Sequence, residues 1–418
     1  AWSCRSLVRR CACAESPTES AAMLQGSSAP VSGSSAELSH ERERDAYSEV
    51  EALWRGVQDF ESLQRPPLAE ASWRSELLEN PEADPRCRRV DVPCGGRLAF
   101  AVEAPDGGGG VFLCPGALSA EGQQALLGRT LRHWARPPNR SNLWPGPVPE
   151  GEDPATAAAA AEASLRGGLE AFVARGGGEG VSADPGAPEA VVEKLRWAVL
   201  GRQYDWATRT YLPEDVAPEL PPELANLAFT VSSALPLPEG AEPRPFDAAI
   251  CNIYHAARRP SDRLGGHRDD VEADTASPLV TVSLGLPCIF LLGGETREAR
   301  PLPILLRAGT LLVMAGRARQ LYHGVPTVLV PPRLQLKGRG PKRKDAGASA
   351  TAHSELGSVY VGPTLDEVPG LLTAALGGIG ASDAVAAAAA AEPEPALEAA
   401  AWLLQRARVS FSIRAVGD

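Results

Sequence analysis

In the C-terminal half of the chain, the hydrophobic positions fall into short runs separated by glycine and proline. Short runs of apolar and β-branched residues between turn residues are typical of β-strands. Many such runs at short intervals predict a sandwich or a jelly roll. The predicted strands are Ala248–Tyr254, Pro278–Leu284, Pro287–Leu292, Pro303–Leu306, Thr310–Met314, Pro326–Val330, Ser358–Val361 and Val409–Val416.

The N-terminal half shows a different spacing. Between residues 41 and 79 the apolar positions recur at helical intervals, from Tyr47 through Val50 and Trp54 to Val57. Residues 111–115 predict a short strand that ends at a proline, and residues 118–134 predict a helix. The chain is therefore expected to be mainly β with flanking helices, an α+β fold.

Low-complexity segments interrupt these patterns, and the chain holds 41 glycines and 38 prolines. Such segments bury too little apolar surface to offset the entropy lost on ordering. One folded domain with disordered inserts is expected. Residues 1–40 form a disordered N-terminus, 41–145 the first part of the domain, and 146–190 a low-complexity insert with at most a short alanine-rich helix. Residues 191–418 form the remainder, with inserts at 331–355 and 376–395.

Charge is distributed unevenly along the chain. The net charge is −11, yet residues 245–344 carry 15 Lys or Arg against 8 Asp or Glu. A basic block within an acidic chain is consistent with a nucleic-acid partner. A solvated basic face is the alternative. The run Lys337–Lys344 is either a nuclear-import or RNA-contact patch or a solvated loop.

The compartment stays open at this stage. No apolar run reaches the length of a membrane span. None of the eight cysteines forms a CxxC pair, so reduced thiols in an intracellular protein are expected. The first 14 residues hold three arginines and no acid, which resembles a transit peptide for a mitochondrion or chloroplast. The basic run favours a nucleus, and the cytoplasm is a further alternative. A monomer is expected.

Three side chains suggest a metal centre. His267 and Asp269 stand two residues apart, so on an extended strand they point to the same side. His323 lies 54 residues after Asp269. Two histidines and one carboxylate on one face are the ligand set of non-haem Fe(II) oxygenases, which leaves positions open for oxygen and a cosubstrate. A surface group of polar residues is the alternative.

The last predicted strand has one polar and one apolar face. A period of two places Arg408, Ser410, Ser412 and Arg414 together, opposite Val409, Phe411 and Ile413. Arginine binds a carboxylate through two parallel hydrogen bonds, so this face suits an anion site inside a barrel. Six residues of strand span about 20 Å, so the two arginines meet one small ligand only if their side chains converge.

Taken together, these motifs resemble the AlkB family of Fe(II)/2-oxoglutarate dioxygenases, and most closely its eukaryotic homologue-one subfamily. The resemblance covers residues 41–145, 190–330 and 356–418. Its motifs are Asn252-x-Tyr254, Leu264-Gly-Gly-His267-Arg-Asp269, Ile289-Phe-Leu-Leu-Gly-Gly294, Val313-Met-Ala-Gly316, Tyr322-His323-Gly-Val-Pro326 and Arg408-x5-Arg414. The features closest to the subfamily are Glu272-Ala-Asp274 and the pair Leu195-Arg-Trp197 and Tyr204-Asp-Trp206.

The resemblance implies a double-stranded β-helix that binds Fe(II) through His267, Asp269 and His323. It implies no catalytic residue beyond this metal centre. It places Arg408 on the distal carboxylate of 2-oxoglutarate, with Tyr254 beside it. Asn252, Ser410 and Arg414 would lie near the keto-acid end, and Ser410 stands where the family usually has asparagine. Candidate substrate contacts are Tyr204, Trp206 and Glu272.

The function implied is oxidative demethylation of alkylated nucleic-acid bases with O₂, with ascorbate as reductant in assays. The products would be formaldehyde, succinate and CO₂. N1-methyladenine in tRNA is favoured and DNA is possible as a substrate. Two other readings stay open: an oxygenase of the same cofactors acting on protein, and a degenerate barrel that only binds nucleic acid.

Overall fold

The computed structural model describes residues 45–59, 62–64, 76–90, 99–144, 154–178, 187–213, 217–257, 259–331 and 392–417. The expected disordered N-terminus, the strand at 358–361 and the basic run at 337–344 lie outside these residues. So do almost all of the insert at 331–355 and residues 376–391 of the other C-terminal insert.

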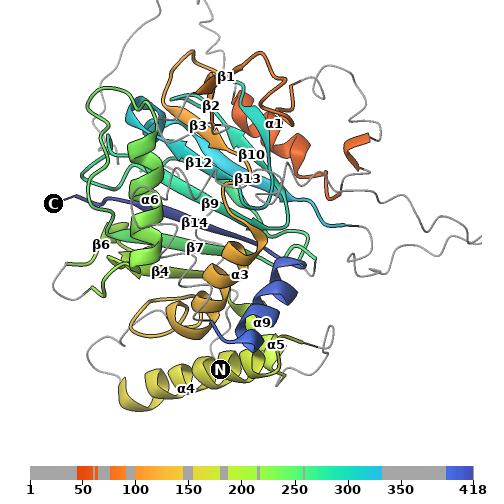
Figure 1. Ribbon diagram of the computed structural model, residues 1–418, viewed down its shortest axis with the longest axis vertical. Coiled ribbons are helices and arrows are strands. Elements are labelled where there is room, and N and C mark those ends of the chain that lie inside the picture. Colours follow the sequence, from red (N-terminus) through yellow and green to blue (C-terminus); the bar gives the residue numbers. More distant parts are fainter. Residues whose placement is uncertain are drawn as a thin grey trace, which may run out of the picture. The chain divides into compact units, whose positions relative to one another are not determined.

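Two antiparallel sheets form the centre of the domain (Figure 1). The larger has the order β1-β2-β3-β12-β9-β14-β7-β4, and the smaller has the order β11-β10-β13-β8. The strands of the larger sheet are β1 (Cys87–Val90), β2 (Ala99–Val102), β3 (Val111–Cys114), β4 (Trp197–Gly201), β7 (Ala248–Tyr254), β9 (Leu279–Gly285), β12 (Leu311–Met314) and β14 (Arg408–Arg414). Those of the smaller sheet are β8 (Leu264–His267), β10 (Cys288–Leu292), β11 (Leu302–Leu306) and β13 (His323–Val328).

Alternation along the strands assigns their side chains to layers. In β12, Leu312 and Met314 join the core between the two sheets, whereas Leu311 and Val313 join the core beneath the helices. In β10, Phe290 lies between the sheets and Ile289 packs on the opposite side. Both faces of these strands are buried, which is why they read as continuous apolar runs. The expected jelly roll with flanking helices is confirmed.

Helices cover the outer face of the larger sheet. Figure 1 shows α6 (Pro222–Ala234), α3 (Ala120–Arg129) and α9 (Glu394–Leu404) in front of the central strands. Helix α3 begins where the Ser119 hydroxyl accepts a hydrogen bond from the backbone N–H of Gly122, a typical N-cap. A π-helical turn, Thr130–Trp134, extends it, so the helix expected over 118–134 is confirmed. In the described parts of the chain, no helix is long and apolar enough to cross a membrane.

The expectation of a low-complexity insert over 146–190, with at most a short helix, is wrong for much of that range. Helix α4 (Pro154–Ala174) has 21 residues, and α5 (Pro188–Lys194) follows it. Leu165, Leu169 and Phe172 are buried in the main core, and the Phe172 ring lies 5.4 Å from that of Trp402. Spacings of four and three residues place these side chains on one helical face, and alanine favours the helix between them.

Most strand predictions are confirmed, but β1, β2, β4, β5, β6 and β8 were not predicted, and β2 and β4 were missed although they are apolar. Seven predicted runs correspond to β7, β9, β10, β11, β12, β13 and β14, within a few residues. The glycine-rich strand β8 and the hairpin of β5 (Tyr204–Asp205) and β6 (Thr210–Tyr211) have too few apolar residues to be recognised by pattern. Strand β8 nevertheless carries a candidate metal ligand.

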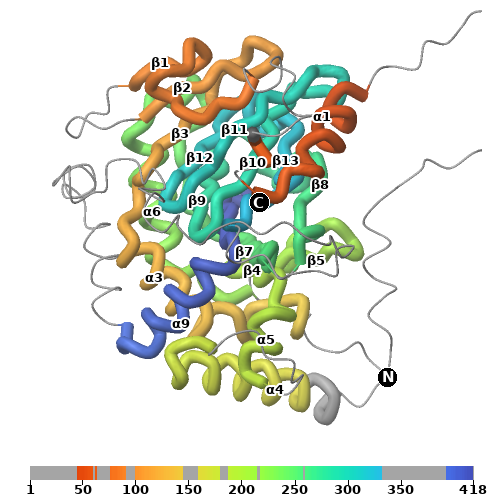
Figure 2. Tube along the Cα trace, turned by 90° about the vertical axis from the view of Figure 1, so that its right-hand side faces the viewer, coloured from red at the N-terminus to blue at the C-terminus, as the bar shows by residue number. Residues whose placement is uncertain are grey.

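Helix α1 (Ala46–Trp54) packs against the outer side of the smaller sheet, beside β8 and β13 (Figure 2). Its buried Tyr47 lies directly on the backbone of Gly266. A Cβ atom at position 266 would lie 2.2 Å from Cε1 of Tyr47, so only glycine fits there. The Gly-Gly pair before His267 therefore lets α1 approach the strand that presents this histidine.

Candidate metal and cosubstrate site

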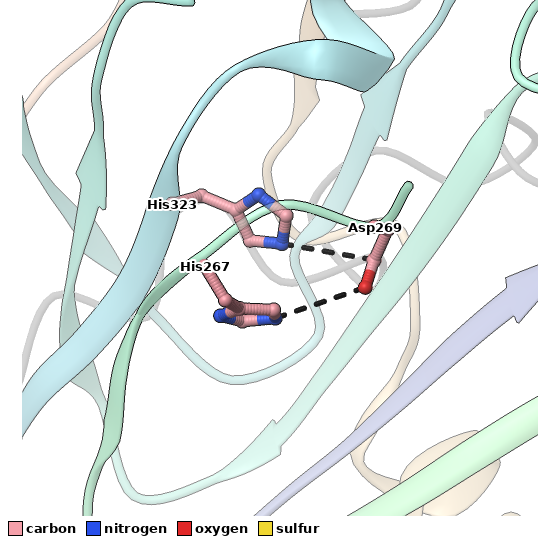
Figure 3. Close-up of side chains that lie close together, drawn as sticks. All are labelled: His267, Asp269 and His323. Atoms are coloured by element: carbon pink, nitrogen blue, oxygen red, sulfur yellow. Dashed lines mark ion pairs between the residues drawn. The ribbon is translucent and has the colours of Figure 1, made fainter. Parts of the chain in front are cut away.

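Strand pairing brings the two candidate histidines together. His267 ends β8 and His323 begins β13, and the two residues are direct partners across the antiparallel pair. Their ring centroids are 4.5 Å apart. Figure 3 shows both imidazoles turned toward the same space. Two residues that are remote in sequence thus become neighbours because the two strands are adjacent.

Asp269 completes the group from the segment that follows β8. Its Oδ1 lies 3.7 Å from Nε2 of His267, and its Oδ2 lies 3.7 Å from Nε2 of His323 (Figure 3). One ligand atom from each residue lies within 4.8 Å of the other two. This arrangement matches the two-histidine, one-carboxylate triad that leaves one side of a metal open. The three predicted ligands are therefore brought together.

Backbone carbonyls orient both imidazoles. Nδ1 of His267 donates to the carbonyl of Gly265 at 2.9 Å, and Nδ1 of His323 donates to that of Leu321 at 3.1 Å. A carbonyl oxygen only accepts, so each Nδ1 carries a proton and Nε2 is the ring nitrogen left for a metal. Such bonds fix the tautomer and ring orientation that a metal ligand requires.

Burial and neighbouring charges set the ionisation of the triad. Burial, together with the proximity of His267, lowers the pKa of His323 to about 4. Burial on its own would raise the pKa of Asp269, but the charge of Arg414 and the two histidines lower it well below its usual range. At neutral pH the site therefore presents a neutral His323 imidazole and an ionised Asp269 carboxylate, which are the forms that bind a metal.

Arg408 forms a separate, cationic part of the interior. It is 1% exposed, and its Nη2 donates to the Ser283 hydroxyl at 3.2 Å. Its Nε and Nη1 have no hydrogen-bond partner. A buried guanidinium with two unused donors is strongly unfavourable unless an anion pairs with it. The two unpartnered donors of Arg408 therefore suit a carboxylate, as predicted for the distal end of 2-oxoglutarate.

Three adjacent strands carry the other predicted cosubstrate residues. Ser410 of β14 lies between Asn252 of β7 and Ser283 of β9 in the strand register. A hydrogen bond links Ser410 to the phenol of Tyr254, and burial raises the pKa of that phenol to about 12. The centroid of the Tyr254 ring lies 6.0 Å from the guanidinium of Arg408. These residues share one side of the sheet, where a ligand next to Arg408 would contact them.

Arg414 does not converge with Arg408. Its Nη1 lies 2.8 Å from Oε1 of Glu272 and 3.3 Å from Oδ1 of Asp269. Its Nε has no partner and remains available as a donor. The two arginines therefore have different surroundings: Arg414 lies at a metal ligand, and Arg408 lies apart with two unpartnered donors.

The candidate substrate residues fall into two groups. Glu272 is buried and bonded to Arg414, Arg319 and Tyr211. Trp206 lies on the hairpin β5–β6 and is 39% exposed, with Tyr204 packed against it at 5.1 Å between ring centroids. Ser283, Arg319 and Tyr211 also contact these residues and were not predicted from the sequence. The period-two polar face of β9 is the signal that could have revealed Ser283.

Comparison with known proteins identifies the family. Residues 158–345 match the 2OG-Fe(II) oxygenase superfamily. The chain is 32% identical over 315 residues to the Arabidopsis thaliana protein named DNA N(6)-methyladenine demethylase ALKBH1A. The aligned region covers 70% of this chain and 87% of that protein. The chain belongs to the AlkB family, in its homologue-one subfamily.

Two further AlkB relatives match shorter stretches. The tRNA demethylase abh1 of Schizosaccharomyces pombe is 35% identical over 144 residues, which is 33% of this chain and 44% of that protein. The human nucleic acid dioxygenase ALKBH1 is 36% identical over 145 residues, which is 35% of each chain. This chain therefore spans less than half of either of these relatives.

The AlkB family implies Fe(II) and 2-oxoglutarate, and the residues fit both groups. His267, Asp269 and His323 would hold Fe(II), with the Nε2 atoms already oriented. Arg408, with two unpartnered donors, would hold the distal carboxylate of 2-oxoglutarate. When bound, Fe(II) and 2-oxoglutarate would supply the oxidising chemistry, and the residues named here would position them.

The contact between Tyr47 and Gly266 gives a first prediction. Gly266→Ala is expected to lower stability by about 1–3 kcal/mol, because the added methyl overlaps the tyrosine ring and one neighbour must shift. It should also weaken metal binding, since the next residue is a ligand. Thermal melting and metal titration of the variant check both effects. Gly265→Ala is the control, because its nearest contact to an added Cβ is 3.7 Å away; equal behaviour of the two variants would contradict the role given to Tyr47.

Proposed function

We propose that this protein removes methyl groups oxidatively from nucleic-acid bases, with N1-methyladenine in tRNA as the preferred substrate and DNA as a second one. The His267–Asp269–His323 triad, in a chain whose relatives are named as nucleic-acid demethylases, is the observation that carries the proposal. The reaction would consume O₂ and release formaldehyde, succinate and CO₂.

An exposed tryptophan on the hairpin β5–β6 supports a base substrate. The Trp206 ring is 4.1 Å from that of Trp197 and packs edge-on against Tyr204. The aromatic neighbours hold the indole while it remains partly open to solvent. Demethylation of a base requires the nucleotide to leave the stack, and aromatic side chains are the usual surface that receives it.

The hairpin that carries Trp206 is attached to the metal-ligand segment. Nη2 of Arg209 lies 3.3 Å from Asp270, and the Tyr211 hydroxyl donates to Glu272 at 2.9 Å. Arg209 is 69% exposed and pairs with Asp270, the residue directly after the metal ligand Asp269. An arginine in this position can bind a phosphate of a nucleotide whose base enters the site.

The described part of the basic block carries little net charge. Six of its 15 basic residues lie between residues 333 and 344, outside the described part of the chain. The remaining nine basic residues nearly balance the eight acidic ones. The proposal therefore depends on individual arginines near the site and not on a general positive field.

Trp206→Ala gives a second prediction. Stacking of a base on an aromatic side chain contributes about 1–3 kcal/mol, so nucleic-acid affinity should fall roughly tenfold. Metal and 2-oxoglutarate binding should not change, because the indole packs on the rings of Trp197 and Tyr204. Fluorescence anisotropy with a labelled methylated stem-loop measures the loss. Unchanged affinity would exclude Trp206 as a stacking residue.

Parallel assays of three substrate classes test the proposal. Purified protein with Fe(II), 2-oxoglutarate and ascorbate is given N1-methyladenine in an RNA stem-loop, the same base in single-stranded DNA, or a methylated peptide. Loss of the methyl group is followed by mass spectrometry. The proposal expects the fastest turnover on RNA, slower turnover on DNA and none on peptide. Turnover on the peptide alone would overturn it.

A further inference from the structure

Glu272 lies at the centre of a buried charged cluster beside the metal ligands. The cluster consists of Tyr211, Asp269, Glu272, Arg319 and Arg414. The Glu272 side chain is 0% exposed. Its Oε1 accepts hydrogen bonds from Arg414 at 2.8 Å and from the Tyr211 hydroxyl at 2.9 Å, and its Oε2 accepts one from Arg319 at 3.4 Å. Three donors from three separate segments thus fix one carboxylate.

Arg414 is shared unequally between two carboxylates. Its Nη1 is 2.8 Å from Oε1 of Glu272 but 3.3 Å from Oδ1 of Asp269, so Glu272 is the nearer partner. An arginine guanidinium can donate two parallel hydrogen bonds to the two oxygens of a carboxylate. Without Glu272, Arg414 would be drawn onto Asp269, and its guanidinium would compete with a metal ion for that ligand.

We propose that Glu272 is a positioning residue that holds Arg414 back from Asp269 and keeps the Asp269 carboxylate available to the metal. The inference concerns metal binding by the triad and needs no nucleic acid. It therefore rests only on the metal-binding part of the proposed function. It also assigns Glu272 a role different from direct contact with a substrate base.

Arg319 and Tyr211 hold Glu272 in place. Arg319 is 1% exposed, and its Nε donates to the carbonyl of Ser277 at 3.1 Å, so the guanidinium is fixed independently of Glu272. Tyr211 comes from β6, the second strand of the hairpin that carries Trp206. The hydrogen bond from Tyr211 thereby links the position of this hairpin to the Glu272 carboxylate, which lies near the metal ligand Asp269.

Metal titration of substrate-free protein tests this role, with Mn(II) as the spectroscopic probe. Glu272→Gln keeps the shape and removes the charge, and Mn(II) binding should weaken by about tenfold, as is usual when a group that orients a ligand is lost. Adding Arg414→Met to this variant removes the competing guanidinium. The double variant should then bind Mn(II) more tightly than Glu272→Gln alone, because the two changes are coupled.

The rescue distinguishes positioning from a purely structural role. If Glu272 only stabilised the fold, the second substitution in the buried cluster would weaken binding further.

Should Glu272→Gln fail to fold, Tyr211→Phe is the milder change. The expected loss of Mn(II) affinity is about two- to threefold, from the removal of one hydrogen bond. Thr208→Ala, on the same hairpin but bonded through its side chain to Thr210, is the matched control. Wild-type Mn(II) affinity in the folded Glu272→Gln or Tyr211→Phe variant, or no rescue in the double variant, overturns the proposal. If Mn(II) binding follows these expectations but the protein does not demethylate nucleic acid, only the proposed substrate is contradicted.

Discussion

His323→Ala is expected to abolish Fe(II) binding and all turnover that depends on 2-oxoglutarate. The imidazole supplies one of three ligand atoms that lie within 4.8 Å of one another, and its Nδ1 bond to Leu321 shows that Nε2 is the ligand. Two remaining ligands leave a weak site. Fe(II) affinity should fall by more than about 100-fold, beyond the loss typical of groups that only orient ligands. Metal analysis after dialysis, together with succinate release, measures both effects.

His133→Ala is the matched control for this variant. His133 is an exposed histidine on the outer helical layer, in the turn Thr130–Trp134. It should keep full metal content and turnover. Normal iron content in His323→Ala would contradict the metal assignment, whereas loss of iron in both variants would point to a general effect of histidine replacement.

Arg408→Ala is expected to separate cosubstrate binding from metal binding. Removal of one partner from a buried charged pair costs several kcal/mol, so 2-oxoglutarate affinity should fall by about 100-fold or more while Fe(II) binding persists. The cosubstrate-free protein should gain stability, because the wild-type guanidinium is 1% exposed and two of its nitrogens lack partners. Isothermal titration with 2-oxoglutarate and thermal melting measure these opposite changes.

Arg408→Lys refines the test. Lysine keeps the charge but cannot make two parallel hydrogen bonds, so it should restore only part of the affinity. Equal loss of iron and of 2-oxoglutarate in Arg408→Ala would make the residue structural. A loss of stability without cosubstrate would contradict the anion pocket.

Most strands from β7 onward could be predicted because they have a buried apolar pattern, whereas β1, β2, β4 and the glycine-rich β8 were not recognised. The alternation of β14 correctly assigned Arg408 and Arg414 to one face and Phe411 to the other. Helix α4 was missed because alanine and glycine dominate its composition and hide the face formed by Leu165, Leu169 and Phe172. Composition alone is therefore a poor guide where a few large side chains are enough for burial.

The metal triad could be predicted from spacing and residue type, whereas its surroundings could not. His267 and Asp269 are neighbours in sequence, and His323 is one of only six histidines. The bonds of Arg319 and Tyr211 to Glu272 join segments that are 47 and 61 residues away from it. Contacts of this kind depend on strand order and side-chain direction, which a single sequence does not specify. For the same reason, the sequence did not show that Arg414 lies at a metal ligand whereas Arg408 lies apart from it.

The most direct test of the account measures formaldehyde and succinate together. Iron-loaded wild-type protein is incubated with 2-oxoglutarate, ascorbate, O₂ and an N1-methyladenine RNA stem-loop, beside a reaction with unmethylated RNA and one with His323→Ala. We expect formaldehyde only when wild-type protein is given methylated RNA. The amount of formaldehyde should equal the extra succinate formed with methylated RNA over that formed with unmethylated RNA. Succinate without formaldehyde from methylated RNA or DNA would contradict the demethylase proposal, and neither product from iron-loaded protein would contradict the assigned active site itself.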